Sequence, residues 1–153
     1  EDFAALVQAA RVRHGAILSI GADVITGFPG ETREEFEEGF AFVESLDLSY
    51  LHVFTYSPRP GTPAAGDPNP VPATLAKART RSLRALGERK RSAFAASMVG
   101  RDLAVFVEGP GERPGELRGL TENFLRARLP AQGLRTGEWA RMTVRDAVRG
   151  FVV

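Results

Sequence analysis

A pattern of strand, helix and strand over residues 17–56 constrains the fold of this chain more than any other feature. Residues 17–26 are rich in Ile and Val and carry one charge, which is typical of a strand buried on both faces. Residues 50–56 are β-branched and aromatic, which predicts a second strand. A helical segment of roughly 14 residues separates the two, so the pattern predicts a βαβ unit with parallel, adjacent strands.

The turn between the first strand and the helix has the sequence Gly27-Phe-Pro-Gly-Glu31. Thr32 and Glu35 have the spacing of a capping box, which predicts that the helix begins near Arg33. The turn has no phosphate-binding glycine motif, and the acidic start of the helix would repel an anion. Ligands of open α/β sheets and barrels bind at such a junction, so we expect a neutral or cationic ligand here. The alternative is a tight connection whose glycines serve only the backbone.

Residues 57–72 contain six prolines, which exclude a helix or a central strand and predict an extended, semi-rigid connection. Its first part, Tyr56-Ser-Pro-Arg-Pro-Gly-Thr62, follows the second strand and fixes Arg59 between two prolines. Loops at this end of a sheet concentrate binding residues, although a rigid surface loop is the alternative.

The remaining segments predict two helices and a set of short strands. Helical spacing of apolar residues predicts an amphipathic helix over residues 2–13. Residues 73–98 predict one long helix. Its predicted packing face is formed by Leu75, Leu83, Leu86, Phe94 and Met98. Short alternating segments then occur at residues 103–108, 123–129, 138–144 and 147–153. Separated by Gly/Pro turns, they predict a small antiparallel barrel of the OB-like kind.

Charge is distributed unevenly along the chain. Residues 1–67 carry eleven acids and four bases, whereas residues 68–153 carry eight acids and sixteen bases. A basic helix followed by a small barrel favours nucleic-acid binding over a merely solvated face. The candidate RNA-binding residues are Lys77, Arg81, Arg84, Lys90, Arg91, Arg118, Arg126 and Arg128. We expect His52 and Trp139 to be core residues, with base stacking on Trp139 as the alternative.

The chain contains no Cys and only two His, so its own residues predict no disulfide, no metal site and no iron–sulfur ligation. No apolar run reaches the length of about 18–20 residues that a membrane-spanning helix needs. The composition therefore predicts a cytoplasmic protein with no membrane partner.

Two strings resemble segments of the radical-SAM tRNA methylthiotransferase family. The string Asp23-Val-Ile-Thr-Gly-Phe-Pro-Gly-Glu-Thr32 resembles the part of the radical-SAM barrel that helps to hold S-adenosylmethionine. Leu48–Phe54 followed by Tyr56–Ala64 is more specific and resembles the branch that acts on threonylcarbamoyladenosine in tRNA, the MtaB type.

The C-terminal half carries a further resemblance. Val71-Pro72, the Arg-rich helix, and Val99-Gly100 leading into residues 103–108 resemble the passage into a TRAM domain, the small RNA-binding barrel of this family. Gly119–Leu125 resembles its central strand entry. The implied organisation is an α/β plus all-β chain with the last βαβ part of a radical-SAM barrel at 1–72, a connecting basic helix at 73–98, and a TRAM domain at 99–153.

The resemblance also implies cofactors and partners. They are S-adenosylmethionine, tRNA, and two 4Fe-4S clusters that cysteines outside this chain would hold. The residues implied to bind S-adenosylmethionine are Asp23, Ile25, Gly27, Gly30, Phe54, Tyr56 and Arg59. Catalytic cysteines are absent, so the chain is expected to be an inactive C-terminal fragment of an enzyme that inserts a methylthio group at C2 of a modified adenosine beside the anticodon.

Two strands cannot close a barrel, so we expect an exposed strand edge that a missing N-terminal part or a neighbouring molecule would cover. Two other functions remain open from the sequence. One is a stand-alone RNA-binding module, and the other is a different radical-SAM enzyme that shares only the glycine-proline turn.

Overall fold

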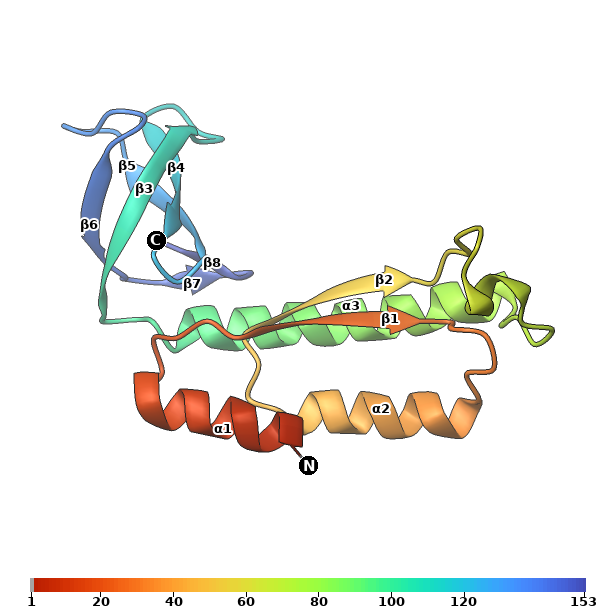
Figure 1. Ribbon diagram of the computed structural model, residues 1–153. Helices are drawn as coiled ribbons and strands as arrows, with labels where there is room; N and C mark the ends of the chain where they lie inside the picture. The colour runs from red at the N-terminus through yellow and green to blue at the C-terminus, as the bar shows by residue number, and fades with distance from the viewer. Residues whose placement is uncertain (1) are drawn as a thin grey trace. The chain divides into compact units, whose positions relative to one another are not determined.

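The computed structural model describes residues 2–153, which form two compact units. The first contains residues 2–8 and 20–88, and the second contains residues 9–19 and 89–153. Figure 1 shows the elements, which in chain order are α1 (Asp2–His14), β1 (Gly21–Thr26), α2 (Arg33–Ser45), β2 (Tyr50–Thr55), the 3-10 helix η1 (Pro63–Gly66), α3 (Ala73–Ala96), β3 (Asp102–Pro110), β4 (Glu116–Thr121), β5 (Arg126–Pro130), β6 (Trp139–Thr143), β7 (Ala147–Val148) and β8 (Phe151–Val152). The predicted division at 72 and 98 stays a prediction.

The first unit contains the predicted βαβ arrangement. Strands β1 and β2 pair in parallel, with α2 between them in the chain. The capping box is confirmed, because the Glu35 backbone N–H donates to Thr32 Oγ1 at 3.1 Å and the Thr32 N–H donates to the Glu35 carboxylate at 2.9 Å. The second of these bonds is the main cause that lowers the pKa of Glu35.

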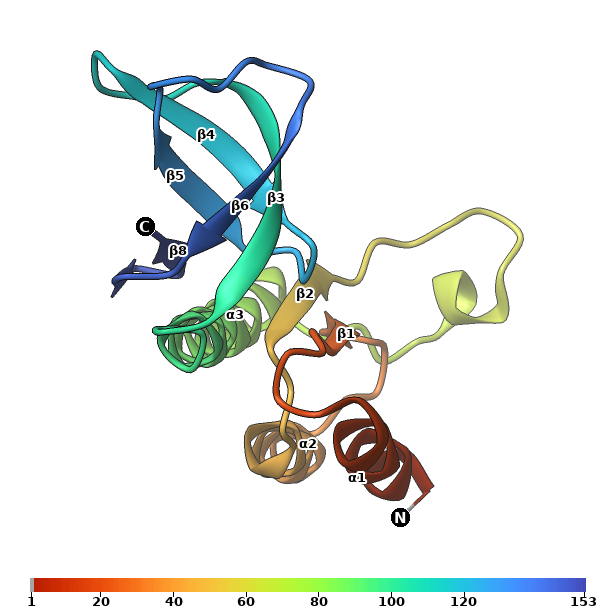
Figure 2. The ribbon, with the colours of Figure 1, turned by 90° about the vertical axis from the view of Figure 1, so that its left-hand side faces the viewer.

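Helices cover only one face of the β1–β2 sheet. Val53 packs with Leu83 and Leu86 of α3, while Val7 of α1 packs with Leu46 and Leu48. Figure 2 looks along the two strands and shows the helices grouped around one side of them. The prediction that the first strand is buried on both faces is therefore wrong for the described residues. No further strand pairs with β1 or β2 within residues 2–153, so no strand covers either outer edge of this sheet.

The predicted packing face of the long helix is confirmed except at its N-terminal end, and Phe94 and Met98 are buried as expected. Leu83 and Leu86 are buried as expected, but Leu75 is 42% exposed. Ala76, Arg79 and Thr80 take the inner positions of the first turns. A hydroxyl cluster holds this end of the helix to the sheet, because Thr80 Oγ1 lies 2.7 Å from the Oγ1 atoms of both Thr26 and Thr55.

The second unit is a six-stranded mixed sheet in the order β6-β3-β4-β5-β8-β7. Strands β5 and β8 pair in parallel, so the prediction of a wholly antiparallel sheet is wrong for that pair. Met98, Leu103, Val105, Val107 and Val152 are fully buried in this unit. Figure 2 shows the strong curvature of the sheet. Its assignment as a TRAM barrel stays a prediction.

The strand predicted at 123–129 begins only at Arg126, because Asn123 and Phe124 form the turn between β4 and β5. The side chain of Asn123 is buried and accepts a hydrogen bond from Thr121 Oγ1 at 2.6 Å. Phe124 has a φ of 64°, a conformation that strands exclude.

Candidate functional site

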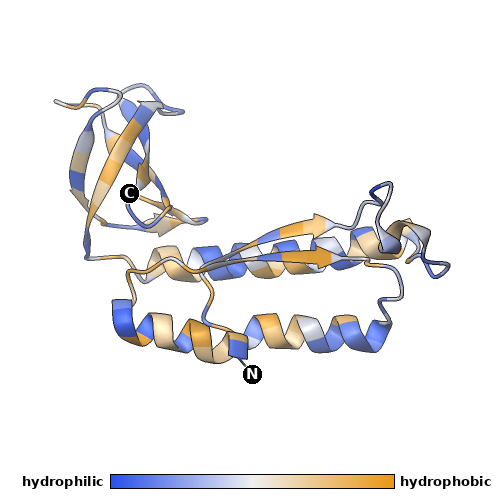
Figure 3. Cartoon of the chain, viewed as in Figure 1, coloured by the Kyte–Doolittle hydropathy of each residue, from blue (hydrophilic) through white to orange (hydrophobic). Residues whose placement is uncertain are grey.

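A cavity of about 1030 Å³ lies at the carboxyl ends of β1 and β2. Four of the seven residues predicted to bind S-adenosylmethionine line it, namely Ile25, Phe54, Tyr56 and Arg59. Figure 3 shows hydrophobic residues at this end of both strands. The cavity therefore lies where parallel sheets hold ligands.

The floor of the cavity is apolar and aromatic. Ile25 and Phe54 lie directly opposite each other on the two strands and are 56% and 52% exposed. The ring of Tyr56 meets the ring of Phe28 edge to face, with centroids 5.0 Å apart. Phe28 also lines the cavity, although its place in the turn gave no reason to select it. Together these side chains offer an apolar, aromatic surface of the kind that holds an aromatic ligand.

The proline-rich loop forms the polar rim. Arg59 and Asp67 both line the cavity, so one guanidinium and one carboxylate border the apolar floor. The Arg59 carbonyl accepts from the Thr62 hydroxyl at 2.8 Å and from the Thr62 N–H at 3.2 Å, which fixes the loop conformation around Arg59. The hydroxyl of Tyr56 is buried without a hydrogen-bond partner among residues 2–153.

An ion pair fixes the turn that precedes α2. Arg79 is only 4% exposed, and its Nη1 lies 2.6 Å from Glu31 Oε2. The same carboxylate oxygen accepts from the Gly27 N–H at 2.8 Å, and Arg79 also donates to the carbonyls of Glu31 and Thr32 at 2.9 Å each. Arg79 of the basic helix therefore serves the turn from within and is not part of the basic surface. The charge of Glu31 is compensated within the fold.

Gly27 and Gly30 both have positive φ, at 73° and 82°, but their surroundings differ. A Cβ at Gly27 would lie 2.5 Å from the Cβ of Ala76, whereas a Cβ at Gly30 would meet no atom within 4 Å. The Gly30 N–H donates to the Asn69 carbonyl at 2.8 Å. Neither glycine lines the cavity, so their observed roles are structural and their cofactor contacts stay predictions.

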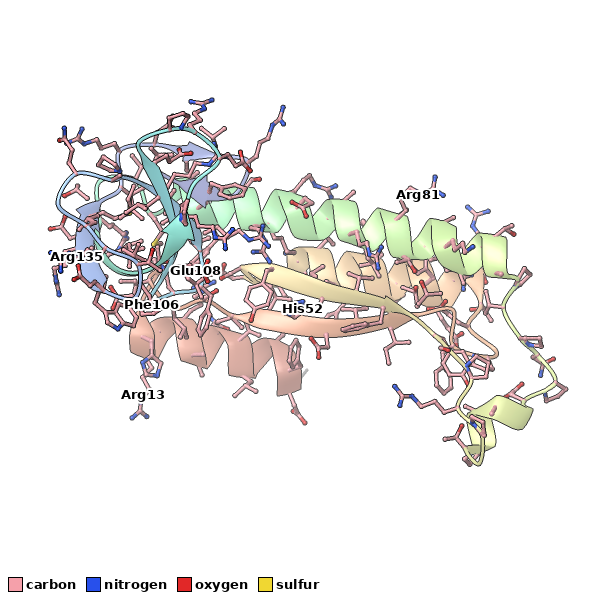
Figure 4. The ribbon with its side chains drawn as sticks, turned by 90° about the horizontal axis from the view of Figure 1, so that it is seen from above. Arg13, His52, Arg81, Phe106, Glu108 and Arg135 are labelled. Atoms are coloured by element: carbon pink, nitrogen blue, oxygen red, sulfur yellow. The ribbon has the colours of Figure 1, made fainter. Side chains whose placement is uncertain are left out.

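Asp23 lies outside the cavity on the open face of the sheet, directly opposite His52. Both side chains are exposed, so the expectation that His52 belongs to the core is wrong. Figure 4 shows His52 on β2, and the Tyr50 ring lies 5.1 Å from the His52 ring. A role of Asp23 in cofactor binding stays a prediction.

The candidate RNA-binding residues of α3 differ in exposure. Lys77 and Arg81 are exposed, and Figure 4 shows Arg81 projecting from the helix. Arg84 is exposed too, but its guanidinium donates to the Val53 carbonyl at 3.2 Å. Lys90 and Arg91 are half-buried and make contacts within the fold.

The three candidate arginines of the second unit lie together. Arg118, Arg126 and Arg128 line a cavity of about 520 Å³ that also contains Phe151. The guanidinium carbons of Arg126 and Arg128 lie 5.9 and 4.8 Å from the centre of the Phe151 ring. Three glutamates share this cavity, and Glu112 pairs with Arg128 at 3.2 Å. The sequence showed the charges but not this grouping.

No group of three or more His, Asp or Glu side chains within residues 2–153 could hold a metal ion. None of the helices described is long and apolar enough to cross a membrane.

No family model matches the chain. It is nevertheless similar to curated proteins named tRNA-2-methylthio-N(6)-dimethylallyladenosine synthase. The identity is 39% over 145 residues to the protein of Cereibacter sphaeroides, which covers 94% of this chain and 33% of the relative. It is 37% over 131 residues to the protein of Bordetella petrii, which covers 85% of this chain and 27% of the relative. The identity to the protein of Burkholderia ambifaria is 41% over 115 residues, or 74% of this chain and 25% of the relative.

The chain thus spans a third or less of the curated relatives it matches. Their names agree with the resemblance to tRNA methylthiotransferases. They support the family in general and not the threonylcarbamoyladenosine branch, because the printed nucleoside is dimethylallyladenosine.

Proposed function

We propose that this chain is part of a radical-SAM enzyme that inserts a methylthio group at C2 of a modified adenosine next to the anticodon in tRNA. The observation that carries the proposal is the similarity over 94% of the chain to a synthase of methylthiolated tRNA adenosine. The cavity at the carboxyl ends of β1 and β2 supports it, because its lining includes four residues that the family resemblance selected independently.

The first unit would form one wall of the S-adenosylmethionine pocket. An adenine ring would lie on the apolar floor of Ile25, Phe54 and Tyr56, since flat aromatic surfaces bind nucleobases by stacking. Arg59 at the rim would face the carboxylate of the same ligand or the RNA backbone. The volume of about 1030 Å³ is at the upper end of the range for ligand sites and fits a nucleoside with an amino-acid tail.

The iron–sulfur clusters of the intact enzyme would be held elsewhere, because none of these 153 residues is a cysteine. Together with S-adenosylmethionine, the clusters would supply the radical and sulfur chemistry. The contribution of this chain is to position the ligand, to exclude water around its adenine, and to hold the tRNA.

The sequence string and the relatives point to two different modified nucleosides of tRNA. The string Tyr56–Ala64 resembles enzymes of threonylcarbamoyladenosine, while the relatives are named for N(6)-dimethylallyladenosine. The two alternatives share an adenosine with a bulky N6 group beside the anticodon, and we propose that shared substrate class. The basic second unit and the exposed bases Lys77 and Arg81 would hold the tRNA backbone, which fixes position without reading sequence.

We expect that Phe54→Ala in the intact protein weakens S-adenosylmethionine binding about tenfold, because removing a stacking ring costs about 1–3 kcal/mol. Isothermal titration calorimetry measures the change. The matched control is Phe42→Ala on α2, since Phe42 is 41% exposed and does not line the cavity. Equal affinities in the two variants would contradict the assignment of this wall.

A further inference from the structure

A row of directly paired residues crosses the outer face of the six-stranded sheet. Trp139 of β6 lies opposite Phe106 of β3, which lies opposite Leu120 of β4. Leu120 in turn lies opposite Arg126 of β5, and Arg126 lies opposite Phe151 of β8. Directly opposite residues point to the same face, and neighbouring strands lie about 4.8 Å apart, so this aromatic row is about 19 Å wide.

The row is on the surface although three of its members are aromatic. Trp139 is 64% exposed and Phe106 is 37% exposed, whereas Val105 and Val107 on either side of Phe106 are fully buried. The expectation that Trp139 belongs to the core is therefore wrong. The rings of Trp139 and Phe106 lie 5.5 Å apart at an angle of 59°, so each supports the other on the solvent side. Figure 4 shows Phe106 projecting from β3.

The charged residues beside the aromatic row indicate the kind of ligand that would bind to it. Arg126 belongs to the row, and Arg118 and Arg128 form the next cross-strand pair on the same face. Arg141 follows Trp139 by two residues and shares its face of β6. Glu108, Glu112 and Glu116 moderate this charge. Glu112 pairs with Arg128, and within residues 2–153 Arg118 and Arg126 are the arginines of this cavity that can meet a polyanion. Exposed rings with guanidinium groups beside them match a ligand made of flat bases and phosphates.

We propose that the aromatic row binds two or three unpaired bases of an RNA strand, with Trp139 and Phe106 stacking on bases and Arg118 and Arg126 contacting the neighbouring phosphates. Sheets of similar width in RNA-binding modules stack this number of bases on aromatic side chains. The inference rests on the proposed tRNA-binding role of the second unit and deepens it. It assigns an unpaired segment of the RNA, rather than a duplex, to this face.

The test uses two labelled eight-nucleotide strands that carry the same charge, one of adenosines and one of abasic ribose phosphates. Anisotropy of the label measures binding to the 153-residue chain, and the fluorescence of its single Trp, Trp139, measures stacking. We expect both strands to bind with a salt dependence, but only the adenosine strand to quench Trp139 and to bind more tightly. Equal binding of the two strands without quenching would overturn the proposal and leave the phosphate-binding role intact. No binding of either strand would overturn both.

Two single substitutions distinguish a loss of base stacking from a general loss of folding. Phe106→Leu should weaken binding of the adenosine strand about tenfold and leave the abasic strand unaffected. Phe124→Leu is the matched control, because Phe124 is 66% exposed in the β4–β5 turn and is no member of the row. Equal losses in both variants, or a loss for the abasic strand alone, would contradict a base-stacking role and favour a protein partner or a purely ionic surface.

Discussion

Arg79→Met should lower the free energy of unfolding of the first unit by about 2–4 kcal/mol, because it leaves the partly buried carboxylate of Glu31 without its partner. Arg79 is 4% exposed, and its guanidinium also satisfies the carbonyls of Glu31 and Thr32. The loss would include the hydrogen bonds to those two partly buried carbonyls as well as the ion pair. Hydrogen exchange of the β1 and β2 amides measures this free energy for the first unit alone.

Arg33→Met is the control for charge and side-chain length. Arg33 pairs with Glu37 at 2.7 Å, but the two side chains are 80% and 58% exposed. Such exposed pairs contribute little to stability, because water and salt screen them. Similar losses in the two variants, or a loss below about 1 kcal/mol for Arg79→Met, would show that the ion pair does not hold the turn.

Gly27→Ala should cost about 2–5 kcal/mol, since two penalties act at one residue. The positive φ of 73° strains any residue with a Cβ, and the new methyl group would lie 2.5 Å from Ala76 on α3. Gly30→Ala shares the positive φ but meets no neighbour within 4 Å, so it should cost only about 1–2 kcal/mol. Urea unfolding followed by circular dichroism compares the two. A larger loss for Gly30→Ala would contradict the close packing of this turn against α3.

Local signals in the sequence predicted much of the first unit. The Thr32–Glu35 capping box and the two β-branched strands each act within a few residues, and both are present. The proline-rich loop is present too, but the exclusion of helix from it is wrong at Pro63–Gly66, which forms the short 3-10 helix η1. The candidate cavity followed from topology, because parallel strands bring Phe54 and Arg59 to the same end of the sheet as Ile25.

Contacts between residues far apart in the sequence could not be predicted from such local signals. Arg79 and Glu31 are 48 positions apart, and nothing in either local sequence indicates that they pair. Helical spacing also failed to separate Leu75 from Ala76, because adjacent positions can each fit an apolar stripe and only the sheet decides which is buried. In the second unit, alternation could not show which face of β6 is inner, so Trp139 was assigned to the wrong side.

We propose that this chain belongs to an enzyme that methylthiolates tRNA. Deleting its gene and digesting the tRNA of the source organism to nucleosides for mass spectrometry tests the claim most directly. We expect one 2-methylthio adenosine to disappear, to be replaced by its precursor without the methylthio group, and to return when the intact gene is restored. The identity of that precursor would decide between the dimethylallyl and threonylcarbamoyl nucleosides. Unchanged levels of every 2-methylthio adenosine in the deletion strain would contradict the claim.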